Sequence, residues 1–164
     1  MHKWLAYSAI SLSACLFASH SALATESQSM NVEQQAWYVS QGEEYLVQEQ
    51  RHGALYALLT TSVEDDIGVY LFFNDADCRG DDGQVLSHEP LYINDQLVRF
   101  SQYCDAPRRY LVPTTANGRY FLIDEFVKRR SVDISSADHR FTATFSAMGF
   151  ADFYRQFQQR FDAM

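Results

Sequence analysis

The chain has 164 residues, of which 21 are acidic, 13 are basic and 15% are aromatic, and its formal net charge is −8. Nucleic acids and anionic lipids repel a chain of this charge, so neither is expected as its main partner. A protein partner is expected instead, and a cationic one would suit the acidic surface best.

Residues 1–24 have the pattern of a cleavable signal peptide. Lys3 precedes an uncharged, largely apolar run that reaches Ala18, and Ala22-Leu23-Ala24 provides a cleavage site with small flanking residues. The run is shorter than the ~20 residues that a membrane-spanning helix requires. We therefore expect export through the inner membrane of a bacterium, and a mature protein that begins at Thr25 in the periplasm or outside the cell.

A lipid anchor is the alternative at this end of the chain. Leu12-Ser13-Ala14-Cys15 has the form of a lipoprotein box, in which the cysteine is acylated and becomes the new N-terminus. The apolar run continues past Cys15 to Ala18, whereas a lipoprotein signal ends at its cysteine. This continuation favours cleavage after Ala24.

Cleavage leaves two cysteines, Cys78 and Cys104. An even number of cysteines in an oxidising compartment predicts a disulfide, and free thiols are the alternative. A bridge over this span would stabilise the fold by roughly 3 to 4 kcal/mol in the chain-entropy model.

The mature chain divides into a flexible arm over residues 25–35 and a single β-rich domain over residues 36–164. Strands are predicted wherever β-branched and aromatic residues cluster or alternate with polar ones. They are expected at 37–39, 45–49, 54–61, 67–73, 91–93, 96–103, 110–112, 132–134 and 140–147. The short polar links 62–66 and Asn94-Asp95 predict two hairpins. Because Pro107 and Pro113 bound the strand at 110–112, it is expected at an edge or as an extended crossing.

Two segments have helical features. Residues 119–130 contain acid-before-base pairs at helical spacing, which favour a helix, although their aromatic start would also suit a strand. Residues 150–164 carry aromatic residues at helical spacing with polar residues between them, and Gly149 precedes them. The predicted fold class is α+β and mostly β: an antiparallel sheet or sandwich with a packed, amphipathic C-terminal helix.

The segment 74–83 is predicted to be a surface loop around Cys78, rich in glycine and acidic residues. Its four carboxylates form the candidate partner-binding site: Asp75, Asp77, Asp81 and Asp82. The loop begins like an EF-hand calcium loop, but Arg79 and Leu86 occupy positions where that motif needs ligands. An irregular calcium site is the remaining alternative to a solvated acidic loop.

Other motifs fail on inspection. His88-Glu89-Pro90 begins like a zinc-protease helix, yet the second histidine is missing and the proline would break the helix. Ser135 to His139 holds the residue types of a hydrolase triad within a single turn, although triad members normally come from distant segments, so a polar hairpin turn is expected. The sequence therefore predicts no catalytic residue, no metal site and no cofactor.

Residues 91–157 resemble the invasion-associated locus B family of exported bacterial proteins. Four segments carry the resemblance, in the order Tyr92–Asp95, Val98–Cys104, Val132–Ile134 and Phe145–Phe150. The resemblance implies a β-rich exported domain that acts at the cell envelope. Members of that family carry extra cysteines, and here only Cys104 falls in a comparable place, so no disulfide pairing follows from the resemblance.

Together these features predict an exported periplasmic or envelope-associated binding or accessory protein without a catalytic site. One alternative is an inhibitor or immunity-type protein that blocks a cationic enzyme or toxin. Another is an enzyme of unrecognised type. Titratable side chains converging in a deep cleft would favour the enzyme, whereas a protruding acidic loop would favour a binder.

Overall fold

A computed structural model describes residues 36–62, 65–79 and 83–162 of the chain. The predicted signal peptide with Cys15, the predicted arm, and Asp81 and Asp82 of the acidic loop lie outside these residues. Within them the chain forms nine strands and two helices. The elements are β1 Tyr38–Val39, β2 Tyr45–Gln48, β3 Leu55–Thr61, β4 Ile67–Asn74, β5 Leu86–Ile93, β6 Gln96–Asp105, β7 Arg108–Pro113, α1 Ala116–Lys128, β8 Ser131–Ser136, β9 Thr142–Ser146 and α2 Phe150–Asp162.

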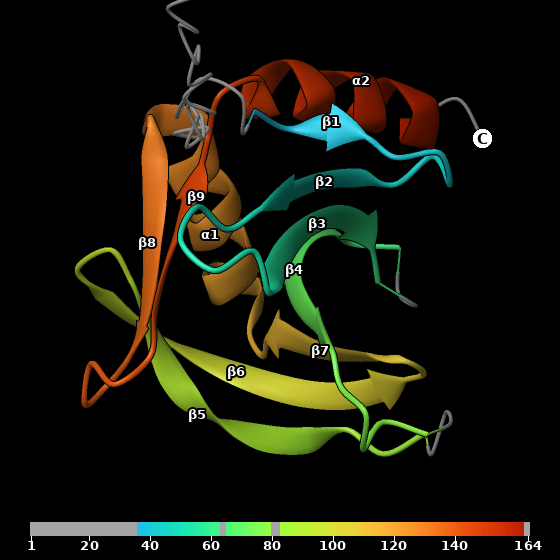
Figure 1. The fold of residues 1–164 in the computed structure, drawn as a ribbon. Coiled ribbons are helices and arrows are strands. Elements are labelled where there is room, and N and C mark those ends of the chain that lie inside the picture. The colour runs from blue at the N-terminus through green and yellow to red at the C-terminus, as the bar shows by residue number, and fades with distance from the viewer. Residues whose placement is uncertain (1–35, 63–64, 80–82, 163–164) are drawn as a thin grey trace, which may run out of the picture.

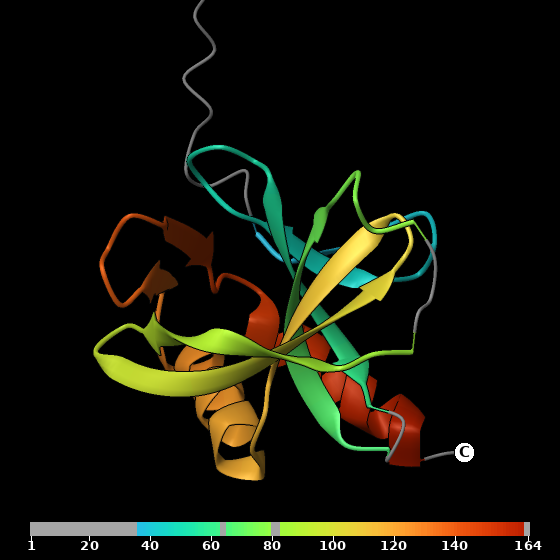
Figure 2. The same ribbon diagram turned by 90° about the horizontal axis from the view of Figure 1, so that it is seen from below.

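The nine strands form one antiparallel sheet in the order β1-β2-β3-β4-β7-β6-β5-β8-β9. The sheet curls so that its two ends approach each other (Figures 1 and 2). The Trp37 N–H, just before β1, donates to the Met148 carbonyl at 3.0 Å, and the Gln50 N–H, just after β2, donates to the Thr144 carbonyl of β9 at 2.9 Å. These bonds tie the first part of the sheet to the last part.

The main hydrophobic core lies on the inner face of the curled sheet. Inward-facing side chains from every long strand pack there with α1 and with the start of α2. Its largest fully buried members are Phe100, Phe126, Phe145 and Phe150. α1 lies across one end of the curled sheet (Figure 2), and α2 runs beside β1 and β2 (Figure 1). This arrangement confirms the predicted α+β class, with a single curled sheet and a packed C-terminal helix.

A second, smaller cluster covers the outer face of β2, β3, β4 and β7. Its aromatic rings follow one another across neighbouring strands: Tyr56 stacks on Phe72 with centroids 5.0 Å apart, and Phe72 lies 5.6 Å from Tyr110. The Arg108 guanidinium lies over the Phe72 ring at 4.4 Å from its centroid. Because β3 and β4 bury side chains on both faces, their sequences are apolar almost without interruption.

Both helices begin at local sequence signals. The Thr115 side chain accepts a hydrogen bond from the Gly118 N–H at 3.1 Å and so caps α1, which confirms the preference for a helix here but starts it earlier than residue 119. A side chain at Gly118 would meet Val98 of β6, because a Cβ there would lie 2.9 Å from Cγ1 of that valine. Gly149, with φ of 82°, separates β9 from α2.

The expectation that residues 110–112 form an edge strand or a crossing is wrong. β7 lies inside the sheet, between β4 and β6. Pro107 precedes this strand in the turn, and Pro113 lies beyond Leu111, the last residue of β7 that pairs with β4. Neither proline therefore removes an N–H group from the β4–β7 ladder, so the usual restriction of proline to edges does not apply.

Candidate functional site

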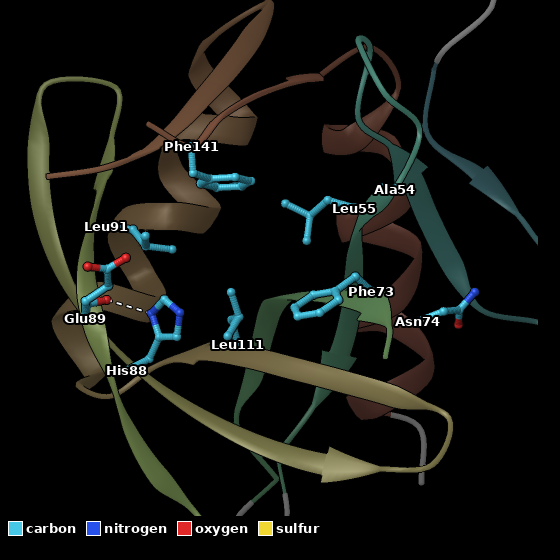
Figure 3. A pocket seen from close by; sticks show the side chains of 9 residues that line it. All are labelled: Ala54, Leu55, Phe73, Asn74, His88, Glu89, Leu91, Leu111 and Phe141. Atoms are coloured by element: carbon cyan, nitrogen blue, oxygen red, sulfur yellow. Dashed lines mark hydrogen bonds between the residues drawn. The ribbon is translucent and has the colours of Figure 1, made fainter. Parts of the chain in front are cut away.

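An apolar pocket opens on the inner face of the sheet, where β3, β4, β5 and β7 come together (Figure 3). Its volume is about 350 Å³. We call it the mouth pocket and define it by its lining residues: Ala54, Leu55, Phe73, Asn74, His88, Glu89, Leu91, Leu111 and Phe141. Leu55, Leu91 and Leu111 also belong to the main core, so the pocket continues the core outward.

Strand pairing explains why side chains from β3, β4 and β7 meet here. Leu55 and Phe73 are direct partners across β3 and β4, and direct partners point to the same face of a sheet. Leu111 of β7 is the partner of Leu71, which lies two residues before Phe73 on β4 and therefore shares its face. Figure 3 shows the side chains of Leu55, Phe73 and Leu111 directed toward a common space.

A β-bulge brings His88 into the same pocket. His88 pairs with Phe100 and Leu91 pairs with Val98, so Glu89 and Pro90 together stand opposite one residue of β6. In a regular strand, residues 88 and 91 would point to opposite faces, because side chains alternate. The extra residue of the bulge restores both to the inner face, since both partners are buried in the main core.

His88 presents one ring nitrogen to the pocket. Its Nδ1 lies 2.7 Å from the backbone carbonyl oxygen of Glu89. A carbonyl oxygen can only accept a hydrogen bond, so Nδ1 carries the hydrogen and donates it. In the neutral ring, Nε2 then has a free lone pair. Figure 3 shows this second nitrogen on the side of the ring that faces Leu111 and the pocket.

Phe141 closes one side of the pocket from the turn between β8 and β9, and 37% of its surface is exposed. Its backbone N–H donates to Ser136 Oγ at 3.1 Å, and Ser136 Oγ donates to Asp138 Oδ1 at 2.7 Å. The hydrogen bond from Ser136, followed by that from Arg140, lowers the pKa of Asp138. Ser135 and Ser136 end β8, and the residues that follow them form a hydrogen-bonded hairpin turn of the kind expected from the sequence.

Two of the four predicted acidic-loop carboxylates lie within the described residues. Asp75 accepts a hydrogen bond from Arg109 Nε at 2.5 Å and another from the Asp77 backbone N–H at 2.9 Å. The bond from Arg109 is the main cause of the lowered pKa of Asp75. Asp75 is therefore already neutralised by an internal cation, while Asp77 is exposed. The partner-binding role of this loop stays a prediction.

Cys78 and Cys104 form a disulfide, with Cα atoms 5.5 Å apart. The bond joins the acidic loop to the end of β6, and both cysteines are buried. Among the described residues, no group of three His, Cys, Asp or Glu side chains could hold a metal ion. Neither described helix is long and apolar enough to cross a membrane.

The sequence did not predict the mouth pocket. Its hydrophobic residues fit the expected strands, but their convergence depends on which strands become neighbours. The one local signal was Pro90 within a strand-like stretch, because proline inside a paired strand commonly marks a bulge. The incomplete zinc-protease pattern around His88 gives no indication of a pocket.

Comparisons with known proteins give no match to this chain among family models, curated proteins or solved structures. Its function is therefore inferred from the mouth pocket and from the chemistry of the residues around it.

Proposed function

We propose that this chain is an exported binding protein that holds a small apolar ligand in the mouth pocket. The observation that carries the proposal is an open pocket whose walls are mostly Leu, Phe and Ala side chains continuous with the core. Exposing apolar surface to water costs free energy. A ligand that covers this surface is stabilised by about 25 cal/mol for each Å² of apolar area removed from water.

The pocket has the size of a ligand site. Small-molecule sites in proteins usually span about 300 to 1,000 Å³, and the mouth pocket has about 350 Å³. An engineered apolar cavity of ~150 Å³ already binds benzene. We therefore expect ligands with about ten non-hydrogen atoms and dissociation constants from roughly 1 μM to 1 mM.

The chemistry of the lining favours binding over catalysis. Among the described residues that line the pocket there is no Ser, Thr, Cys or Lys that could act as a nucleophile beside His88. The remaining polar groups are the side chains of Asn74 and Glu89 and a single imidazole. Such a sparse polar set is typical of sites that orient an apolar ligand.

The predicted location agrees with this role. The disulfide between Cys78 and Cys104 is compatible with an oxidising compartment such as the periplasm. The signal-peptide pattern over residues 1–24 and the resemblance to invasion-associated locus B proteins support an exported protein of the cell envelope. We propose the periplasm or the outside of the cell as its place of action.

Binding can be tested with prodan, an uncharged naphthalene dye whose fluorescence rises in apolar surroundings. The mature protein should bind prodan saturably. Ala54 lies exposed at the rim of the pocket, so Ala54→Trp should obstruct the opening without disturbing the core and should weaken binding at least tenfold.

Ala151→Trp is the matched control, because Ala151 is also exposed but lies on α2, outside the pocket lining. This variant should bind prodan like the unchanged protein. Absence of saturable binding, or equal weakening by both tryptophans, would show that the pocket does not hold apolar ligands.

A further inference from the structure

The residues that line the mouth pocket also indicate which polar group its ligand has. We infer that the ligand is an apolar molecule with one uncharged hydroxyl group, which donates a hydrogen bond to Nε2 of His88. This inference rests on the proposed function, since it concerns the ligand of the same pocket. Its basis is the contrast between a mostly apolar lining and the ring nitrogen Nε2 of His88, to which no described residue donates a hydrogen bond.

The backbone determines which hydrogen-bonding role Nε2 has. The Glu89 carbonyl holds the hydrogen of His88 on Nδ1, because an acceptor cannot bind the lone pair of that nitrogen. The bulge directs the ring toward the pocket, with Leu111 beside it (Figure 3). A neutral imidazole held in this way offers a ligand an acceptor, so the complementary ligand group is a donor.

A ligand without a donor would leave this acceptor unsatisfied. When an apolar molecule fills the pocket, it displaces the water that reaches Nε2, and a polar atom that loses water without gaining a partner is costly. Sites built around such a polar group therefore bind analogues that lack the matching group more weakly. A hydroxyl removes the cost because it supplies the hydrogen.

Charge around the pocket disfavours a carboxylate ligand. Of the described lining residues none is Lys or Arg, and Glu89 is acidic. Arg109 pairs with Phe73 across β4 and β7 and so lies on the same face, but its guanidinium is bound by Asp75 at 2.5 Å. A fatty carboxylate would therefore meet the acidic side chain of Glu89, and Arg109 is already paired with Asp75.

The test compares three ligands of nearly equal size as competitors of prodan in a mildly alkaline buffer. Octanol has the apolar chain and the hydroxyl. Heptyl methyl ether is its isomer without a donor, and octanoate replaces the hydroxyl by a carboxylate. Octanol should displace prodan at about tenfold lower concentration than the ether, the effect of one hydrogen bond to an otherwise unsatisfied acceptor. Octanoate should be weaker than octanol.

His88→Phe keeps a ring of similar size but removes the acceptor. The variant should still bind prodan, which has no donor. Octanol and the ether should displace prodan from the variant at equal concentrations. His52→Phe is the control, since the His52 side chain is exposed outside the pocket; it should keep the tenfold preference.

The outcomes separate the two proposals. If prodan binds but octanol and the ether compete equally in the unchanged protein, the hydroxyl inference is wrong while the binding function stands. The same conclusion follows if octanoate competes best, or if His88→Phe keeps the preference for octanol. If prodan does not bind at all, the proposed function fails and this inference fails with it. The ligand series in the unchanged protein decides the question even if His88→Phe does not fold.

Discussion

Replacing Phe150 by alanine should destabilise the fold more than any equivalent change elsewhere on α2. Phe150 has 0% exposure and lies where β9 passes into the helix. Its ring is 4.8 Å from that of Trp37, 5.2 Å from that of Phe126 and 5.8 Å from that of Tyr154. It therefore connects the start of the described chain, α1 and α2.

The magnitude follows from burial and from the space left behind. Removing a fully buried phenylalanine forfeits about 2 to 3 kcal/mol of transfer free energy. A residual cavity of about 50 Å³ would add about 1 kcal/mol, at ~24 cal/mol for each Å³. Alanine is the best helix former, so no loss of helix propensity adds to these costs. We expect the free energy of unfolding to fall by about 3 to 4 kcal/mol.

Phe157→Ala is the matched control on the same helix. Phe157 is half-buried and contacts Tyr45 at a centroid distance of 5.5 Å. Its removal leaves a surface depression that water can fill, so we expect a loss of only about 1 to 1.5 kcal/mol. Urea unfolding monitored by circular dichroism measures both. Equal losses in the two variants, or a loss below about 1 kcal/mol for Phe150→Ala, would refute the assignment of Phe150 to the core.

Two further predictions concern the acidic loop. Reduction of the Cys78–Cys104 bond, which spans a sequence separation of 26 residues, should lower the free energy of unfolding by about 3 to 4 kcal/mol; both thiols freely alkylated in protein purified without reductant would contradict it. The pKa of Asp75 is lowered from 3.8 by Arg109, so the pair stabilises the fold above pH 3.8 and this contribution is lost as the pH falls toward the native pKa. Unfolding midpoints measured from about pH 6 down to about pH 3 should therefore fall more steeply for the unchanged protein than for Arg109→Gln, and parallel curves would exclude the ion pair as the cause.

Local signals predicted the hairpins well. β3 and β4 form the expected pair, and Asn94, with φ of 50°, makes the tight turn between β5 and β6. Asn94 Nδ2 also donates to the buried carboxylate of Glu125 at 2.5 Å, so the turn is held from α1 as well. These features depend on residues close in sequence and on turn chemistry, which a single sequence displays.

The features around the pocket that the sequence missed or predicted wrongly depend on distant contacts. The interior position of β7 requires β4 as its neighbour, and nothing local to residues 108–113 indicates that pairing. Likewise, simple alternation would turn His88 and Leu91 to opposite faces, and only the register against β6 shows otherwise. The mouth pocket is a product of these two non-local features, which is why the candidate site could not be predicted.

The bonds that join the two ends of the sheet also constrain when the protein can finish folding. Trp37 meets Met148, and Gln50 meets Thr144, so nearly the whole chain must have been made before its earliest strands are enclosed. Contacts this distant in sequence form slowly, because a long loop must close first. A partly synthesised chain therefore cannot close its sheet. For the export that we propose, this delay would leave the sheet unclosed while the chain crosses the membrane.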